Sequence, residues 1–272
     1  MGKEGNQASS FADYAIPRFK DLRRVLFWHG RPYGVRLLNL ANFVIYKAII
    51  KSANNYALQW VNGFSGFQAV EGLMHIFFNI LMTTFFNFIV SVYDQDVSFE
   101  KYGTIEKEKN LPVPMAEMYA FSRLQCDRKR FVFRMLLFDL YALITGFGIF
   151  LLFYYSQGAM NAKGWMYDVA TYGVVSTVIV VYLHHVQVAI SVRNWTGWIL
   201  FWFMLSFLMM PLTCFAAQLG PYTQLHKSIY RHLVASPQLD AIILLTVGAF
   251  SAPLIFHKYV HQLILWPRYY TD

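Results

Sequence analysis

The sequence predicts an all-α polytopic membrane protein with six transmembrane helices. The 272 residues are 57% hydrophobic and only 14% charged, which is unusual for a soluble domain. They also contain six mostly apolar stretches, each longer than the about 20 residues that span a bilayer. Hydrocarbon offers the backbone no hydrogen-bond partner, so each stretch is expected to be helical. The expected spans are 36–62, 67–93, 132–156, 166–192, 197–219 and 238–262.

The distribution of positive charge supports this span count. Lysine and arginine gather in residues 1–36 and in 94–134, which fall on one side of the membrane if there are six spans. The opposite side holds only Lys163, Lys227 and Arg231. The positive-inside rule then predicts both termini on the cytoplasmic (or matrix) side. The net charge of +8 therefore reflects membrane topology, and no nucleic-acid partner is predicted.

The chain is expected to have a short N-terminal region and one membrane domain. Residues 1–35 form a basic tail and an amphipathic segment suited to the membrane interface. Residues 36–266 form the six-helix domain with an inner-side loop at 94–131, and 267–272 form a tail after an aromatic anchor. Gly2 is followed by a poor myristoylation pattern, and Cys126 and Cys214 are not expected to form a disulfide.

The first two expected spans carry polar side chains at helical spacing. The turn at 62–67 is short enough that these spans must be antiparallel neighbours. The resulting candidates for lipid-headgroup contact are Lys47, Lys51 and Asn54 on the first span, and Asn79, Thr83 and Asn87 on the second. Ionisable groups at this depth usually face a bundle interior or a wet cavity. We expect the two sets to face each other or to line a lipid-filled crevice, although such stripes can also simply join helices.

Two carboxylates follow the second span. Asp94 and Asp96 could form a catalytic pair, a metal site or a structural turn. A metal would need more oxygen ligands, and only Glu100 and Glu106 follow, without an EF-hand pattern. A turn in which the carboxylates accept backbone N–H groups is the expected role.

Two histidine pairs are weaker candidates. His257 and His261 have the i, i+4 spacing of helical metal ligands, but no third ligand is evident. His184 and His185 are adjacent and point to different faces, so no site is expected there. No metal or cofactor is therefore predicted. Asp139 is expected to pair with Arg134 or Arg130.

A series of short motifs resembles the C-terminal membrane region of type-IV P-type ATPases, the lipid flippases. The series is DYAIPRFKDLRRVLFWHGR (13–31), YK (46–47), GFSG (63–66), YDQDV (93–97) and RNWTGW (193–198). Their order and spacing follow the family over about residues 13–266. The resemblance implies that Lys47 contacts a lipid headgroup. It also implies that Asp94, Gln95 and Asp96 form a family structural turn.

Parts of the family pattern are missing. The chain has no D-K-T-G-T stretch with its acceptor aspartate, no nucleotide-binding or actuator domain, and no earlier spans, so ATP hydrolysis by this chain alone is not expected. Ala48 follows Lys47 where the family has asparagine, and Phe86 replaces a family proline. Phe86 is expected to restore a regular helix, which suits a static scaffold better than a moving gate.

The sequence favours a non-catalytic, flippase-derived membrane subunit with bound phospholipids. It would act as a scaffold or lipid-contacting component of a larger assembly of membrane subunits, with a mitochondrial respiratory complex as one candidate. The main alternative is the transmembrane half of a split flippase whose ATPase domains are on another chain. A truncated product or an independent lipid scramblase is a further alternative.

Overall fold

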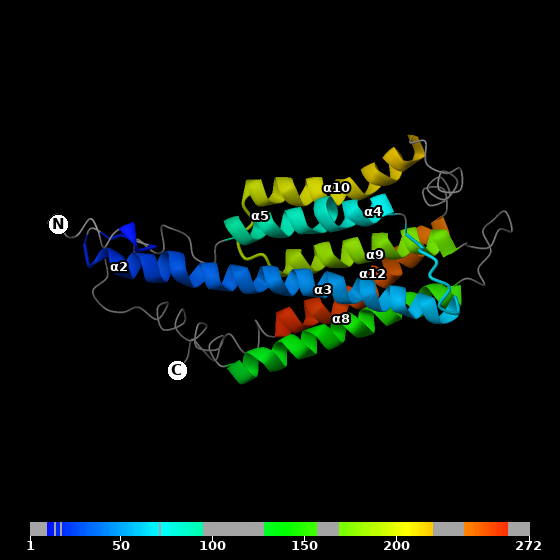
Figure 1. The fold of residues 1–272 in the computed structure, drawn as a ribbon, viewed down its shortest axis with the longest axis horizontal. Helices are drawn as coiled ribbons and strands as arrows, with labels where there is room; N and C mark the ends of the chain where they lie inside the picture. The colour runs from blue at the N-terminus through cyan, green and yellow to red at the C-terminus, as the bar shows by residue number, and fades with distance from the viewer. Residues whose placement is uncertain are drawn as a thin grey trace.

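The computed structural model describes residues 10–13, 15–16, 18–70, 72–94, 128–156, 169–219 and 237–260, and this part is helical without any strand. Figure 1 shows the long helices lying side by side along one direction. Their bounds are α3 Arg31–Val61, α8 Arg128–Ser156, α9 Val169–Ser191, α10 Gly197–Leu219 and α12 Pro237–Val260. A further run is formed by α4 Gly72–Phe77, η2 Phe78–Thr84 and α5 Phe85–Tyr93.

The first helix begins well before the expected first span. α2 (Asp21–Arg24) and η1 (Val25–Gly30) lead into α3 without a break, so the basic N-terminal segment is helical from residue 21. At about 1.5 Å per residue, such a run is far longer than a bilayer core of about 30 Å. The run is therefore too long to lie wholly within the bilayer core.

A tight turn joins α3 to the second helical run. Gly63 has a φ of 60°, a left-handed conformation that glycine adopts without steric cost. Phe64 follows with a φ of 56°, and its N–H donates to the Gln59 carbonyl at 2.9 Å. The Gln59 side chain then donates to the Phe67 carbonyl at 3.2 Å. The turn reverses the chain, and α3 packs against α5 as the short connection predicts.

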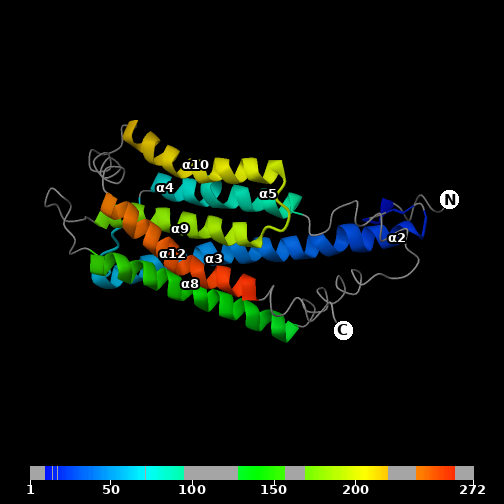
Figure 2. The same cartoon turned by 180° about the vertical axis from the view of Figure 1, so that it is seen from behind.

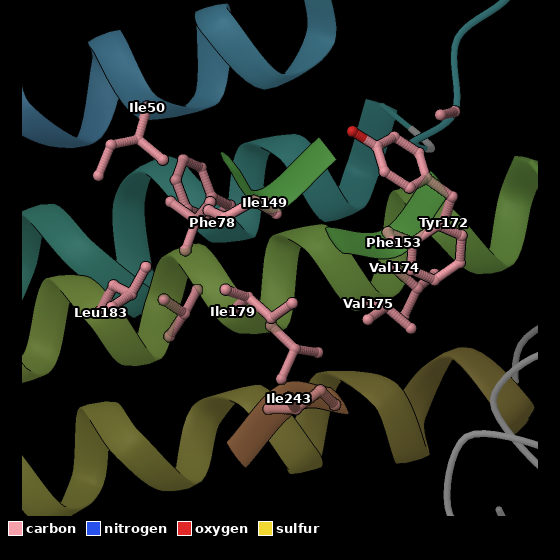
Figure 3. Close-up of a cluster of buried hydrophobic side chains, with 14 of the residues drawn as sticks. Ile50, Phe78, Ile149, Phe153, Tyr172, Val174, Val175, Ile179, Leu183 and Ile243 are labelled. Atoms are coloured by element: carbon pink, nitrogen blue, oxygen red, sulfur yellow. The ribbon is translucent and has the colours of Figure 1, made fainter. Parts of the chain in front are cut away.

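α9 occupies the middle of the bundle. In Figures 1 and 2 it lies between α10 with the α4–α5 run on one side and α12 with α8 on the other. Side chains all around it are buried, from Ala170 to Val188, as expected for a helix at the centre of a bundle, and polar residues such as Thr177 and His184 are among them. Figure 3 shows the core that it organises, to which Ile50, Phe78, Ile149, Phe153 and Ile243 contribute from the surrounding helices.

Four helices of the described part are long and apolar enough to cross a membrane. They are Met74–Tyr93, Met135–Ser156, Val169–Ser191 and Pro237–Tyr259. The apolar stretch of α10, Gly197–Thr213, is shorter, and α3 carries two lysines along its length. Apart from the helical run that precedes residue 36, the observed helices begin and end within a few residues of the predicted ranges. The six-span topology remains a prediction.

We expect tags at the two ends of the chain to be accessible from the same side of the membrane. In Figure 1, α3 begins and α12 ends at the same end of the bundle. Protease treatment of sealed vesicles should therefore remove both tags together, or neither. Cleavage of one tag with protection of the other would require an odd number of spans.

Candidate functional site

Lys47 lies at the centre of a cluster of oxygen atoms between α3 and η2. Its Nζ donates hydrogen bonds to Thr83 Oγ1 at 2.7 Å, Thr84 Oγ1 at 2.6 Å and the Asn79 carbonyl at 3.3 Å. The side chain is buried, with 5% of its surface exposed. A buried ammonium is costly unless its donors are satisfied, and here three oxygens satisfy all three of them.

A π-helical segment supplies these oxygens. The hydroxyl of Thr83 donates to the carbonyl of Phe78, five residues earlier, at 2.7 Å, and lies 3.3 Å from the Asn79 carbonyl. π-helical turns leave the regular ladder of backbone bonds and often occur at functional sites. The second span is therefore not a regular α-helix throughout, although the regular helix expected at Phe86 itself is confirmed. The irregularity precedes Phe86 and exists without a proline, and carbonyls of the segment accept hydrogen bonds from the side chains of Lys47, Thr83 and Ser206.

Phe86 itself is α-helical and fills the space beside α9 and α10. Its ring stacks on His185 with centroids 5.8 Å apart and meets Phe203 edge-on at 5.4 Å. With 1% of its surface exposed, it provides the bulk that the sequence predicted at this position.

Lys51 and Asn54 lie on the same helix as Lys47 but face α9. Lys51 Nζ donates to Thr177 Oγ1 at 2.6 Å, and Thr177 in turn donates to the Gly173 carbonyl. The side-chain oxygen of Asn54 accepts a hydrogen bond from the hydroxyl of Tyr172. The polar stripe of α3 is therefore divided between two neighbours and does not face the second span alone.

Asn87 also contacts α9. Its Oδ1 lies 3.0 Å from His184 Nε2, and both side chains are fully buried. Of the predicted candidates, the structure thus brings Lys47, Asn79 and Thr83 together, and it places Lys51, Asn54 and Asn87 against α9.

His184 and His185, at which no site was expected, form hydrogen bonds with the polar residues around α9. The rings of His184 and His185 are nearly perpendicular, at 88°, so they do point in different directions. His185 Nε2 lies 2.9 Å from Ser206 Oγ, and Ser206 donates to the Met82 carbonyl of the π segment at 3.0 Å. His185, Ser206 and Met82 become neighbours because α9 packs against other helices on all sides. The spacing of residues in one sequence does not predict such packing.

Asp94 joins the end of α5 to the turn between α9 and α10. Its Oδ1 accepts the backbone N–H groups of Arg193 at 3.2 Å and Asn194 at 3.1 Å. Nearby, the guanidinium of Arg36 donates to the Val92 carbonyl at 2.9 Å. The carboxylate therefore accepts backbone N–H groups, and these come from a distant segment. The turn expected at residues 94–96 stays a prediction, because Gln95 and Asp96 lie outside the described residues.

Several expectations concern residues outside the described part or side chains that it does not describe. These are Gln95, Asp96, Glu100, Glu106, Cys126, Arg130, Arg134, Cys214 and His261. Within the described residues no group of three or more histidine, cysteine or acidic side chains is placed to hold a metal. His257 is exposed near the end of α12.

The family model for the C-terminal region of phospholipid-translocating P-type ATPases matches residues 9–267. The chain belongs to this family. It is 26% identical over 98% of its length to the mouse phospholipid-transporting ATPase IH, and 25% identical over 98% to the human protein of that name. A shorter match, 35% identical over 36% of the chain, is to the phospholipid-transporting ATPase neo1 of Schizosaccharomyces pombe.

This flippase-family chain spans under a quarter of the length of these relatives, with 22% and 23% of the two ATPase IH proteins covered. The catalytic domains of the family lie outside the matched region and are absent from these residues. The expected resemblance is therefore confirmed, and the chain supplies membrane-embedded helices of the flippase type. The Lys47 cluster lies within this matched region.

Replacing Asp94 by alanine should destabilise the junction between α5 and the α9–α10 turn. The change leaves the N–H groups of Arg193 and Asn194 without their shared acceptor. Hydrogen bonds to a charged acceptor contribute about 1.5–3 kcal/mol each, so the loss of two should lower the unfolding free energy by about 3–6 kcal/mol. Thermal melts in detergent measure it. Asp94→Asn, which keeps an acceptor oxygen, is the matched control and should lose less than half as much. Equal melting of Asp94→Ala and the unchanged protein would contradict the role.

Proposed function

We propose that the chain is the C-terminal membrane part of a phospholipid flippase whose ATP-hydrolysing domains lie outside these residues. Those domains would be carried by another polypeptide or by the rest of a longer one. The observation that supports this most is the Lys47 cluster, where a buried cation is held against an irregular helix in a family that moves phospholipids. A buried ionisable group of this kind usually marks a substrate path in a membrane bundle.

In this proposal Lys47 exchanges partners during transport. Its three oxygens come from one π-helical segment, so a change from π to α spacing would move Thr83, Thr84 and Asn79 relative to the ammonium. The phosphate of a phospholipid headgroup would then replace them as acceptor. A charge-assisted bond to phosphate is stronger than a bond to a neutral hydroxyl, which favours the exchange.

A second candidate is a non-catalytic scaffold in a larger membrane assembly, such as a mitochondrial respiratory complex. One observation favours it: the three donors of Lys47 are already satisfied by oxygens of this chain. In that case Lys47 holds helices together, and its removal weakens assembly. Ala48 in place of the family asparagine fits this candidate as well.

The two candidates differ in whether lipid moves when ATP is supplied. Membrane vesicles from cells with and without the chain are loaded with a fluorescent phospholipid, and its movement between leaflets is followed with ATP and with a non-hydrolysable analogue. The flippase proposal expects ATP-dependent movement that requires the chain. The scaffold candidate expects no such movement and a native complex that loses subunits when the chain is removed.

A further inference from the structure

Lys51 is a second buried cation, one helical turn from Lys47, and most of its donors are unused within the described residues. Its side chain is 4% exposed, and among those residues its ammonium makes one hydrogen bond, to Thr177 Oγ1 at 2.6 Å. An ammonium has three donors. Lys47, by contrast, has an acceptor for each donor. The two ammonium groups are each 5.8 Å from the centre of the Phe78 ring, so they share this aromatic neighbour.

Asn54 adds unused donors on the same face of α3. It lies three residues after Lys51, which brings the two side chains to neighbouring positions on the helix. The side chain is completely buried, and its amide nitrogen Nδ2 has no hydrogen-bond partner in the part of the chain that the structure describes. Its oxygen is already bonded to Tyr172. A buried amide nitrogen without an acceptor is uncommon in proteins.

The acceptor that would satisfy both residues is not a carboxylate of the described chain. Within the described residues, Lys51 contacts a hydroxyl and an aromatic ring and no acidic side chain. A positive charge in an apolar interior is costly without an acceptor or counter-charge. An oxyanion would meet the free donors of Lys51 and Asn54 together, because its oxygens accept several bonds from one direction.

We propose that Lys51 and Asn54 form an oxyanion site that takes a phosphate group, separate from the Lys47 cluster and nearer the turn at Asn62. The phosphate belongs to a phospholipid headgroup or is free in solution, and the experiment separates these sources. The lipid source rests on the proposed function. The site itself does not, because its binding can be measured on the full chain without ATP or transport.

The test compares two lipids that differ only in the headgroup. The full chain is purified in detergent, depleted of lipid and mixed with dioleoylphosphatidylglycerol or with dioleoylglycerol, which has the same tails and no phosphate. Native mass spectrometry reports the lipid retained. We expect retention of the phospholipid over the diacylglycerol, and a fall of about tenfold or more in Lys51→Met, as for the loss of one charge-assisted hydrogen bond.

Lys258→Met is the matched control. Lys258 donates to the Ile190 carbonyl near the end of α12, away from this site, so the variant removes one lysine and should retain the phospholipid as the unchanged chain does. Inorganic phosphate is the second probe. If it raises the melting temperature of the lipid-free chain and the effect is lost in Lys51→Met, the site takes free phosphate. If only the phospholipid does so, the site is specific for the headgroup.

Asn54→Asp provides a second variant if Lys51→Met fails to fold. It places a carboxylate beside Lys51, which should raise the melting temperature of the lipid-free chain and abolish phospholipid retention. Equal retention of both lipids by the unchanged chain, with no response to phosphate, would overturn the proposal. Glu71, which precedes α4 in the sequence, is the carboxylate to exclude. A Glu71→Gln change that lowers the melting temperature of the lipid-free chain, but has no such effect in a Lys51→Met background, would also overturn the proposal, because a carboxylate of the chain would then hold the ammonium.

Discussion

Replacing Gly173 by alanine should lower the melting temperature of the protein by roughly 6 to 12 °C. Overpacking a dense core costs about 3 kcal/mol, and in a protein of this size each kcal/mol lowers the melting temperature by about 2–4 °C. A Cβ at this position would lie 1.8 Å from the carbonyl oxygen of Ala69 and 2.4 Å from its carbonyl carbon. These are backbone atoms, so no flexible side chain can yield. Either α9 or the segment after the turn must move.

Gly248 is the matched control for this change. It lies in α12, and a Cβ there would meet nothing within 4 Å. Gly248→Ala should leave the melting temperature unchanged or raise it slightly, since alanine favours helix over glycine by about 0.5–1 kcal/mol. Similar melting of the two variants would mean that the close approach of Ala69 to α9 is not maintained in the membrane. Scanning fluorimetry in detergent and in nanodiscs would measure both.

Replacing Lys47 by methionine should reduce ATP-dependent phospholipid movement by about 10- to 100-fold, the range expected when a charge-assisted hydrogen bond to the transported headgroup is lost. The melting temperature should be unchanged or higher. Methionine is similar in length and removes the cost of burying a charge, which offsets the loss of the three hydrogen bonds that Lys47 donates. Thr83 keeps its bond to the Phe78 carbonyl in the variant, so the π segment retains one of its supports.

This result is informative because lipid movement should fall while the melting temperature does not. Lys258→Met again serves as the control and should leave both quantities unchanged. A variant at Lys47 that moves lipid normally but loses subunits from its native complex would favour the scaffold candidate. One that is normal in both respects would mean that the cluster of Asn79, Thr83 and Thr84 serves neither function.

The sequence predicted the helices and the nearest contacts better than the rest of the site. α10 occupies 197–219 as expected, and α9 lies within its predicted range, because long apolar stretches report helices directly. The contact of Lys47 with Thr83 was also predictable, since a turn as short as 62–67 makes the flanking helices neighbours. The motifs around these residues further identified the family.

Contacts with α9 could not be predicted in this way. Tyr172 bonds Asn54 across 118 positions, and His184 bonds Asn87 across 97, so only the tertiary packing brings them together. The π segment was missed for a related reason. It contains no proline or glycine, and its carbonyls are satisfied by side chains from three helices, including Lys47 and Ser206. Helical periodicity does not record such contacts.

We have proposed that these helices work with an ATP-hydrolysing flippase domain. Phosphoenzyme formation can be measured in the native assembly, isolated through a tag on this chain. After brief incubation with radiolabelled ATP and acid quenching, we expect label on a polypeptide segment outside these 272 residues, with none on the residues themselves. We also expect added phospholipid to speed loss of the label. An intact assembly without any acid-stable phosphoenzyme, with or without lipid, would contradict the proposal.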